Sequence, residues 1–316
     1  MSTREESRRT PTTWPTVGVV IPTRNRPELL RRALDAVAAQ DYPGTIETLV
    51  VFDGVEPDTE LNTQADPWRP VRVVTNTRTP GLSGTRNTGI LALDTVFVAF
   101  CDDDDHWLPT KVRRQVERAT APDRPDMVTC SITVDYDGNR TDRFAGTDSV
   151  THADLTRSTF AMLHSSCFFF DRRALIERIG LVNEELPESQ LEDWDIKLRA
   201  ARLRPIAHID EPLTVVQWGR TSLFARRWDS KIAALEEILE LHPAIADDRR
   251  SAARVYGQIA FGTAAAGRRT ESWRWIRRCV RTDPRQWRAG AALVVLPHPP
   301  NAERVLGALH HFGRGV

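Results

Sequence analysis

Phe97-Val-Ala-Phe-Cys-Asp-Asp-Asp-Asp-His-Trp-Leu-Pro109 is the stretch that decides the fold of this chain. Its apolar run, which starts at Thr95, is typical of a buried strand and ends in four consecutive carboxylates, Asp102 to Asp105. Four like charges destabilise a strand end unless a cation lies beside them, and hard divalent cations prefer oxygen ligands. Because ligands of open α/β sheets bind outside the carboxyl ends of the strands, the stretch predicts a metal-assisted nucleotide site.

A solvated acidic turn is the alternative interpretation of the same four residues. Aspartate is a common helix N-cap, and a helix is expected from Pro109 to about Arg118. Within the run, Asp105 is the member expected to do no more than cap this helix. The choice between a cation site and a cap therefore depends on what the other strand ends carry.

The bulk composition limits the class of protein. The chain has 316 residues, 41% of them hydrophobic, which suffices for one large domain or two of medium size. Lys plus Arg and Asp plus Glu both number 43, so the net charge is zero and nothing in that balance indicates a nucleic-acid partner. No apolar segment approaches the roughly 20 residues that span a bilayer, so we expect no transmembrane segment, and peripheral membrane contact stays open.

The four cysteines indicate a reduced, cytoplasmic setting. They show neither a CxxC spacing nor a zinc pattern. Cys101 and Cys167 lie in or beside apolar runs, where a free cysteine behaves as a small buried residue. The polar N-terminus lacks the apolar core of a signal peptide, and we expect residues 1–15 to form a disordered lead-in.

The first 120 residues alternate between strand and helix patterns. Short apolar runs predict strands and helical spacing predicts helices, in the order strand 17–21, helix 27–40, strand 46–52, strand 71–74, helix 85–93 and strand 95–101. This alternation predicts an α/β fold with a mainly parallel sheet and right-handed crossovers. The strand ends carry Thr23 and Arg24, Asp53, Arg86 and Asn87, and the aspartate cluster, which together favour one shared cleft over four plain turns.

The second half of the chain has weaker signals. We expect a β-hairpin in 127–149, strands at 160–170, 206–209 and 213–216, and a short helix at 172–179. Leu191-Glu-Asp-Trp-Asp begins a strong amphipathic helix, with Glu192 and Asp193 in its first turn. From about residue 225, periodic Ala, Leu, Ile and Trp predict three to five helices in a C-terminal all-α region without obvious chemistry.

Five stretches, in this order, resemble family 2 glycosyltransferases with the GT-A fold. They are Val-Gly-Val-Val-Ile-Pro-Thr-Arg-Asn-Arg (17–26), Leu-Val-Val-Phe-Asp-Gly (49–54), Gly-Leu-Ser-Gly-Thr-Arg-Asn-Thr-Gly (81–89), Phe-Cys-Asp-Asp-Asp-Asp-His-Trp-Leu-Pro (100–109) and Leu-Glu-Asp-Trp-Asp (191–195). The resemblance covers roughly 17–222. It implies a GT-A domain at 16–224, with a nucleotide-binding half at 16–120 and an acceptor half at 121–224, followed by a helical domain at 225–316.

The resemblance implies that the aspartate cluster is the DxD motif of these enzymes. Asp104 is then the direct metal ligand, while Asp102 and Asp103 contact the metal or the donor ribose. The cation, Mn²⁺ or Mg²⁺, neutralises the diphosphate and stabilises it as the leaving group. Phe52 stands where the family often has the first of two aspartates. The other residues implied to bind the nucleotide sugar are Pro22, Thr23, Arg24, Asp53, Gly81, Ser83 and Arg86.

Glu192-Asp193 matches the catalytic acidic motif of the family. The match implies that Asp193 is the general base that deprotonates the acceptor hydroxyl on the face opposite the departing nucleotide. Crowding with Glu192 and Asp195 is expected to raise the pKa of Asp193, which suits a base. The alternative is that these carboxylates only interact with the helix dipole.

The acceptor side is implied by the same resemblance. His164 and Ser165 lie where the family shapes the acceptor site, and Glu192 and Trp194 flank the base. Arg220 lies in a loop that, in the family, can close over the diphosphate. The plainer interpretations are that His164 is a packed or hydrogen-bonded side chain and that Trp194 packs the helix.

The sequence favours an inverting, metal-dependent glycosyltransferase. The donor is a nucleotide sugar, with UDP as the favoured nucleotide, and the acceptor is a hydroxyl on a glycan, a lipid-linked or a small molecule. A nucleotidyltransferase is the second hypothesis, but its usual glycine-rich phosphate loop is missing at 22–27. A non-catalytic sugar-nucleotide-binding module is the third, and the presence of Asp193 argues against it. The C-terminal helices are the expected surface for any homo-oligomer, and any membrane contact is expected on the inner, cytoplasmic face.

Overall fold

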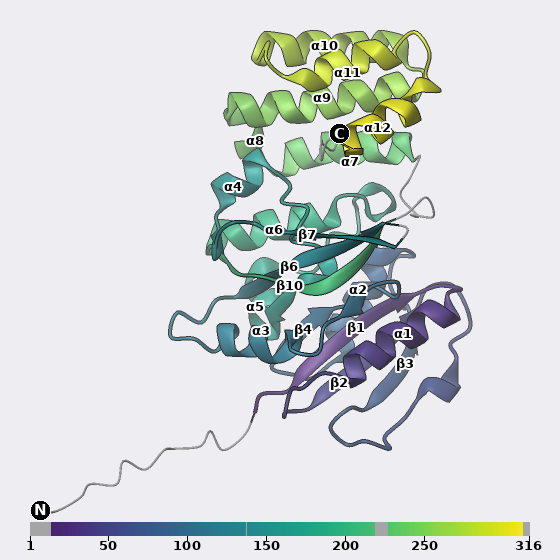
Figure 1. Ribbon diagram of the computed structural model, residues 1–316, viewed down its shortest axis with the longest axis vertical. Helices are drawn as coiled ribbons and strands as arrows, with labels where there is room; N and C mark the ends of the chain where they lie inside the picture. The colour runs from purple at the N-terminus through teal and green to yellow at the C-terminus, as the bar shows by residue number, and fades with distance from the viewer. Residues whose placement is uncertain (1–13, 137, 219–226, 312–316) are drawn as a thin grey trace, which may run out of the picture.

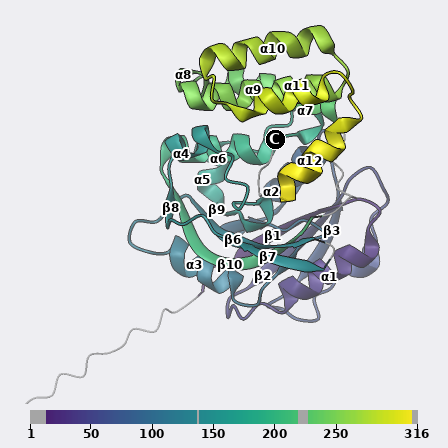
Figure 2. The same ribbon diagram turned by 45° about the horizontal axis from the view of Figure 1, so that its top comes forward.

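A ten-stranded sheet runs through the computed structural model, which describes residues 14–136, 138–218 and 227–311 (Figure 1). The strand order is β3-β2-β1-β4-β9-β6-β10-β5, with β7 paired to β6 and β8 paired to β10. Helices cover both faces of the sheet, and the C-terminal helices stack beyond one of these faces (Figures 1 and 2). The expected lead-in lies outside the described residues, apart from Trp14 and Pro15.

The first half of the sheet is parallel, as the sequence predicts. Its strands are β1 (Val17–Thr23), β2 (Ile46–Phe52), β3 (Val71–Thr75) and β4 (Phe97–Phe100), connected in part by α1 (Pro27–Ala38) and α2 (Leu82–Ala92). All seven residues of β1 are buried, and the strand lies between β2 and β4. This burial on both faces explains why its sequence is a nearly continuous apolar run. Parallel pairing brings the carboxyl ends of these strands to one edge of the sheet.

Helix α2 begins three residues earlier than predicted. Gly81 precedes it with a φ of 115°, a conformation that favours glycine, so the helix starts directly after this residue. Gly84 lies inside the first turn, where an added Cβ would stand 1.9 Å from the carbonyl oxygen of Thr79. Gly81 therefore allows the helix to start at Leu82, and Gly84 allows its close contact with the preceding loop.

The second half of the sheet is mixed. It contains β5 (His106–Trp107), β6 (Met127–Tyr136), β7 (Asn139–Arg143), β8 (Ser149–Val150), β9 (Phe169–Asp171) and β10 (Ile206–Trp218). β6 and β7 form the expected hairpin, β10 runs parallel to β6, and β9 runs antiparallel between β4 and β6. The expected α/β architecture is thus present, with its parallel character confined largely to β1, β2, β3 and β4.

Three predictions in this half are wrong in detail. The strand expected at 160–170 is shortened to β9, because the chain turns through a 3-10 helix, η2 (Ser165–Cys167), before it reaches the sheet. The two strands expected at 206–209 and 213–216 are one strand, because β10 continues through an irregularity around Pro212. The helix expected at 172–179 divides into α5 (Arg172–Ala174) and the π-helix η3 (Leu175–Ile179).

Two apolar layers enclose the sheet. On one face, α1 and α3 (Lys111–Ala119) pack with Leu30, Val37 and Val112 against the strands. On the other face, α2 and α6 (Glu192–Leu203) pack with Ile90 and Leu198, and α4 (His152–Arg157) lies beside α6. Two further 3-10 turns, η1 (Thr59–Leu61) and η4 (Pro187–Ser189), lie in the loops before β3 and α6.

The described C-terminal region contains six helices, one more than the largest predicted number. They are α7 (Trp228–Leu241), α8 (Ala244–Asp247), α9 (Arg249–Ala265), α10 (Arg269–Thr282), α11 (Trp287–Val295) and α12 (Asn301–His311). The extra element is the four-residue α8, which is too short for a periodic signal. Ile232, Leu235 and Ile238 of α7 belong to the same apolar cluster as α6. No helix in the described ranges is long and apolar enough to cross a membrane.

Candidate active site

The ends of β1 and β4 meet at the aspartate cluster. The hydroxyl of Thr23 donates a hydrogen bond to Asp103 Oδ2 at 2.8 Å. Arg26 Nη1 donates to Asp103 Oδ1 at 3.1 Å and to Asp104 Oδ2 at 2.8 Å. Thr23 is therefore beside the cluster, as expected. Arg24 is exposed, and the arginine after β1 that pairs with Asp103 and Asp104 is Arg26. The position of Arg26 three residues after the end of β1 could have identified it from the sequence as a cation near the cluster.

Asp53 joins the end of β2 to the start of α2. Its carboxylate accepts a hydrogen bond from the Gly81 backbone N–H at 3.1 Å and from Asn76 Nδ2 at 2.9 Å. Just inside the helix, Ser83 donates its backbone N–H to Ser189 Oγ at 3.1 Å. The Ser83 hydroxyl is buried and has no hydrogen-bond partner in the described part of the chain. A polar group left without a partner at a helix N-terminus suits contact with a bound anion.

Arg86 connects the aspartate cluster to the acidic motif of α6. The side chain is only 1% exposed, and its guanidinium donates to Asp102 Oδ1 at 2.6 Å and to Glu192 Oε1. Burial acts to lower the pKa of Arg86, but the two carboxylates outweigh it and hold this pKa above its usual value. In return, Arg86 outweighs the effect of burial on Asp102 and keeps the pKa of that carboxyl below its usual value.

The 3-10 helix η2 and the residue before it also contact the aspartate cluster. Ser165 Oγ donates to Asp102 Oδ2 at 2.9 Å, and Ser166 Oγ donates to Asp105 Oδ2 at 2.5 Å. His164 Nδ1 lies 3.3 Å from the same oxygen of Asp105. Burial opposes the charge on this imidazole, yet Asp105 and Asp102 raise the pKa of His164 to about 9. His164 is therefore protonated at neutral pH and acts as a counter-charge for the cluster.

Asp105 does not cap the following helix, contrary to the prediction. α3 begins at Lys111, and Thr110 occupies its N-cap position without a side-chain hydrogen bond. Asp105 is buried instead and accepts hydrogen bonds from Ser166 Oγ and from the backbone N–H of Gln217, the latter at 3.2 Å. The carboxylate thus ties β4 to η2 and β10, because tertiary partners satisfy it before the helix starts.

The loop before α6 has an unusual backbone. Glu188, Ser189 and Leu191 have φ angles of 51°, 57° and 63°, in the left-handed region that non-glycine residues rarely adopt. Such conformations persist where the surrounding structure fixes them, and they cluster at functional sites. Here they position the first turn of α6, which carries Glu192 and Asp193, beside Arg86.

The predicted rise in the pKa of Asp193 is wrong. Burial does push this pKa upward, but Lys197 Nζ lies 3.1 Å from Asp193 Oδ2 and, with His164 and Arg86, holds it below its usual value. The pKa that rises is that of Glu192, to about 7, because of burial and of the neighbouring Asp193 and Asp102 charges, despite Arg86. Lys197 follows Asp193 by four residues, a spacing that predicts such a pair on a helix.

Trp194 does not face the site, so its expected contact with the acceptor is also wrong. The side chain is fully buried, and its indole Nε1 donates to the carbonyl oxygen of Leu155 at 2.9 Å. The guanidinium of Arg254 lies 4.8 Å from its ring. Adjacent helical residues point in different directions, so Trp194 points into the core while the neighbouring Asp193 is half-buried. Arg220 lies outside the described residues.

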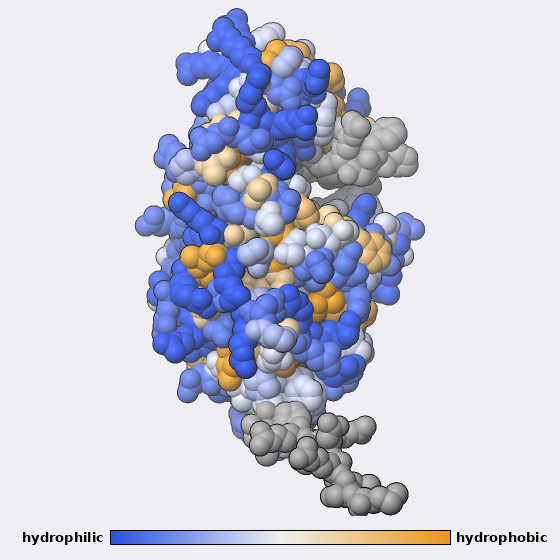
Figure 3. Space-filling view, turned by 90° about the vertical axis from the view of Figure 1, so that its left-hand side faces the viewer, coloured by the Kyte–Doolittle hydropathy of each residue, from blue (hydrophilic) through white to orange (hydrophobic). Residues whose placement is uncertain are grey.

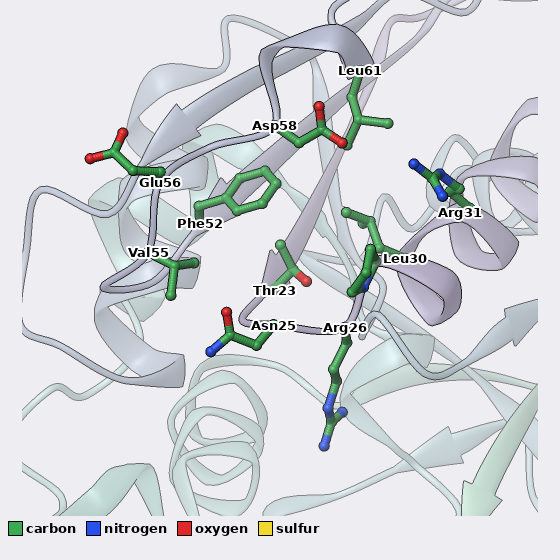
Figure 4. A pocket seen from close by; sticks show the side chains of 11 residues that line it. Thr23, Asn25, Arg26, Leu30, Arg31, Phe52, Val55, Glu56, Asp58 and Leu61 are labelled. Carbon is green, nitrogen blue, oxygen red and sulfur yellow. The ribbon is translucent and has the colours of Figure 1, made fainter.

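A pocket opens next to the cluster, between the first turn of α1 and the loop after β2 (Figure 4). Phe52 lies at its centre, with Thr23 and Asn25 on one side and Asp58 on the other. Arg26 borders the pocket but extends its guanidinium away from Phe52, toward Asp103 and Asp104. An aromatic ring bordered by a few polar side chains can hold a planar base.

Comparison with known proteins decides the family. Residues 18–179, half of the chain, match the family model described as Glycosyl transferase family 2. The chain belongs to glycosyltransferase family 2. It is 27% identical over 185 residues to the GalNAc(5)-diNAcBac-PP-undecaprenol beta-1,3-glucosyltransferase of Campylobacter jejuni, over 57% of this chain and 59% of that protein. It spans between 34% and 59% of the length of the first curated relatives that it matches.

Solved structures share the fold of this chain. S. aureus TarS in complex with UDP-GlcNAc superposes with a TM-score of 0.60 at 17% sequence identity, over 95% of this chain and 92% of that chain. The mannosyltransferase PcManGT from Pyrobaculum calidifontis, in complex with GDP-Man and Mn²⁺, superposes with a TM-score of 0.54 at 16% identity, over 94% and 87% of the two chains. At these identities the likeness shows the GT-A fold.

The aspartate cluster fits a hard divalent cation. Asp104 is the most exposed aspartate of the cluster, with 34% of its side chain accessible. Burial together with its three aspartate neighbours raises its pKa to about 7, against the effect of Arg26. Carboxylates that repel one another in this way are stabilised by a bound cation. Asp102, Asp105 and His164 also bring donor atoms within 4.8 Å of one another. Hard divalent cations prefer the carboxylate oxygens of this group.

Proposed function

We propose that this glycosyltransferase moves a sugar, with inversion, from a UDP-sugar to the hydroxyl of an acceptor. The observation that carries the proposal is the buried Arg86, which pairs with Asp102 on one side and Glu192 on the other. It holds the strand end that would receive the donor diphosphate next to the helix turn that bears a carboxylate base. A UDP-GlcNAc complex of the similar TarS structure supports UDP as the first nucleotide to test.

Donor binding is assigned to the strand ends at the carboxyl edge of the parallel sheet. Pro22, Thr23 and Arg24 would lie along the nucleotide, with the base in the pocket around Phe52. Asp53, Gly81, Ser83 and Arg86 would support the donor from the start of α2, as would Asp103 from the cluster. Residues 16–120 then form the nucleotide-binding half of the enzyme.

Asp104 and Asp102 are the residues that would hold Mn²⁺ or Mg²⁺. A cation there supplies positive charge to the diphosphate as it departs. The oxygen-only donor set and the raised pKa of Asp104 support this assignment, as does the Mn²⁺ complex of the similar mannosyltransferase structure. Asp102 would keep its ion pair with Arg86, so the protein contributes both the ligand and its orientation.

Asp193 is the proposed general base. It would accept the proton of the acceptor hydroxyl as the new bond to the anomeric carbon forms and the bond from that carbon to the diphosphate oxygen breaks. Its lowered pKa keeps Asp193 ionised at neutral pH, and Lys197 fixes the orientation of the carboxylate. Glu192 would hold Arg86 instead of touching the reacting atoms.

The acceptor is assigned to residues 121–224, with His164, Ser165 and Glu192 at its border with the donor. The undecaprenol-linked substrate in the name of the Campylobacter jejuni relative supports a polyprenol-diphosphate-linked saccharide as the first acceptor to test. Residues 225–316 form a helical domain in this proposal. A reducing, cytoplasmic compartment is consistent with the four buried free cysteines.

A donor panel tests the proposal. UDP-, dTDP- and GDP-sugars are added with and without Mn²⁺ or Mg²⁺, and thermal shift and product formation are measured. We expect a UDP-sugar to raise the melting temperature only with metal, and Asp104→Asn to remove that rise. Asp94→Asn, at an exposed position, is the matched control. A metal-dependent shift without product would indicate a binding module, nucleotidyl transfer would indicate the other enzyme class, and no shift with any donor would refute the nucleotide site.

A further inference from the structure

Positive charge is concentrated in the outermost layer of the C-terminal helices. Residues 268–288 contain eight arginines and two acidic residues, a net charge of +6 in a chain whose total charge is zero. α10, which lies within this segment, forms the end of the molecule farthest from the sheet (Figures 1 and 2). The charge is thus gathered on one end of the protein, far from the aspartate cluster.

Five of the arginines at the N-cap of α10 and along the helix fall into two groups. Arg268 pairs with Asp229, and Arg278 stacks on the rings of Tyr256 and Trp275, so these cations serve the packing of the helices. The second group, Arg274, Arg277 and Arg281, is exposed and forms no ion pair or hydrogen bond with any described residue. Their spacing of three and four residues puts them on one stripe of α10. This stripe therefore presents three charges that the fold does not use.

Exposed apolar side chains border the arginine stripe. Trp273 and Val280 of α10 are 46% and 42% exposed, and they share one edge of the helix because they are seven residues apart. Arg269, one turn before Trp273 on the same edge, donates to the carbonyl oxygen of Pro297 at 3.1 Å, so this edge lies beside α11.

The apolar edge continues onto the neighbouring helix. On α11, Leu293 and Val294 are 41% and 60% exposed. Figure 3 shows hydrophobic side chains at this end of the molecule among long hydrophilic ones.

We propose that this α10–α11 face docks on an anionic lipid bilayer. Basic helices that carry Trp and aliphatic residues on an adjoining strip lie in the membrane interface, with the apolar strip at the acyl boundary and the cations among the headgroups. Arg274, Arg277 and Arg281 would contact lipid phosphates, while Trp273, Leu293 and Val294 would enter the interface. The inference concerns a surface outside the catalytic site and does not depend on the identity of the sugar.

Two other occupants fit the face less well. A second copy of the chain would bring the three arginines against their own equivalents in a two-fold contact, and like charges repel. A nucleic acid would use the arginines but not Leu293 or Val294, which offer nothing to a phosphate or a base edge. A bilayer surface with anionic headgroups uses both the charges and the apolar side chains, which is why we favour it.

Vesicle sedimentation of the full chain tests the proposal. We expect binding to phosphatidylglycerol–phosphatidylcholine vesicles, little binding to pure phosphatidylcholine, and loss of binding as salt is raised. The triple variant Arg274→Gln, Arg277→Gln, Arg281→Gln should bind about a hundredfold more weakly, at about fivefold per arginine. The triple variant Arg173→Gln, Arg202→Gln, Arg250→Gln removes three exposed arginines elsewhere and should bind within about twofold of wild type.

A second readout locates the contact. Brominated lipids in the vesicles should quench the tryptophan fluorescence of the wild-type protein more than that of Trp273→Phe. Melting temperatures of all variants, without vesicles, show that they are folded. Equal loss of binding in the two triple variants, equal binding to both lipid mixtures, or quenching that does not change in Trp273→Phe would overturn the assignment. A change of mass in light scattering for the α10 variant alone would assign the face to a second copy instead.

Discussion

At Arg86, two carboxylates from distant parts of the chain share one buried guanidinium. Asp102 follows β4 and Glu192 opens α6, and both lie against a side chain that is almost inaccessible to water. Removing one partner of a buried ion group leaves an uncompensated charge in a medium of low dielectric constant. Substitution of Arg86 is therefore expected to destabilise the fold, and the residue lies between the two acidic motifs.

A double-mutant cycle measures this coupling. Arg86→Met should lower the free energy of unfolding by about 3–5 kcal/mol, because Asp102 and Glu192 lose their counter-charge. Combining it with Glu192→Gln should cost less than the sum of the two single changes, because the neutral amide no longer needs the cation. Urea unfolding followed by circular dichroism gives the four values. Strict additivity would show that Arg86 and Glu192 do not interact energetically.

Glu184 was not singled out by the sequence, yet it anchors the start of α2. Its carboxylate accepts hydrogen bonds from Asn87 Nδ2 at 2.6 Å and from the Thr79 backbone N–H at 3.2 Å, and it pairs with Arg78. Burial alone would raise its pKa, but these donors lower the pKa of Glu184 to about 2. Asn87, which the sequence placed near the donor, is thereby a structural residue that holds Val182 and Glu184.

The lowered pKa of Glu184 predicts an acid-sensitive contribution to stability. A carboxyl group whose pKa is depressed in the folded state stabilises it above the unfolded pKa, and the contribution is lost as the pH falls from about 4.5 to about 2. About 3 kcal/mol should disappear over this window in wild type and be absent from Glu184→Gln. Glu185→Gln, at an exposed neighbour, should behave as wild type. Urea midpoints at pH 3 and 7 that fall equally in wild type and Glu184→Gln would contradict this origin of acid sensitivity.

At the scale of elements, the first turn of α6 is fixed from two sides. Leu191 and its predecessors enter it with left-handed φ angles, and His242, at the end of α7, bonds Asp195 from the other side. His242 Nε2 lies 2.9 Å from Asp195 Oδ1, with both side chains buried. Asp195 lies in the same helical turn as Asp193, so α7 contributes to the position of the proposed base.

Loss of this contact should affect catalysis more than donor binding. His242→Asn removes the bond to Asp195 Oδ1 with a smaller polar side chain, and we expect kcat to fall about tenfold while the KM for the donor stays within about twofold. His298→Asn, an exposed histidine of the same region, is the control. A loss of stability with unchanged kcat would assign His242 a purely structural role. Steady-state kinetics and urea unfolding of both variants separate the two.

At the scale of the whole molecule, the C-terminal helices and the sheet share one apolar cluster. Ile238 of α7 is fully buried in the cluster that also contains Trp194 and Leu198 of α6. A second cluster, around Phe261 and Ile276, holds α9 and α10 together. The two clusters make the helical region an extension of the sheet's helical layer.

A shared core predicts a single unfolding transition. Ile238→Ala should destabilise the whole chain by about 2–5 kcal/mol, because it leaves a cavity in the apolar cluster that α7 shares with α6. Circular dichroism and intrinsic fluorescence should report the same urea midpoint in this variant and in wild type. Leu241→Ala, at an exposed position of the same helix, should cost far less. Two separated transitions would show that residues 225–316 unfold as an independent domain.

The parts of the fold that the sequence predicts are those that local patterns determine. β1, β2 and β4 are largely buried apolar runs, and the polar residues after them share an edge because parallel strands end together. The role of Asp105 depends on Ser166 and Gln217, which are 61 and 112 residues away in sequence, and no local pattern shows such a contact. The lowered pKa of Asp193, in contrast, could have been predicted from Lys197, which follows it by four residues on the helix.

Donor affinity and transfer rate of Asp193→Asn test the central claim most directly. Calorimetry with a UDP-sugar and Mn²⁺ gives the donor Kd, and single-turnover transfer to the acceptor gives the chemical rate. If Asp193 is the base, the variant should bind the donor within about twofold of wild type but transfer the sugar about 10²–10⁴ times more slowly. Transfer by Asp193→Asn at a rate within about threefold of wild type would contradict the account.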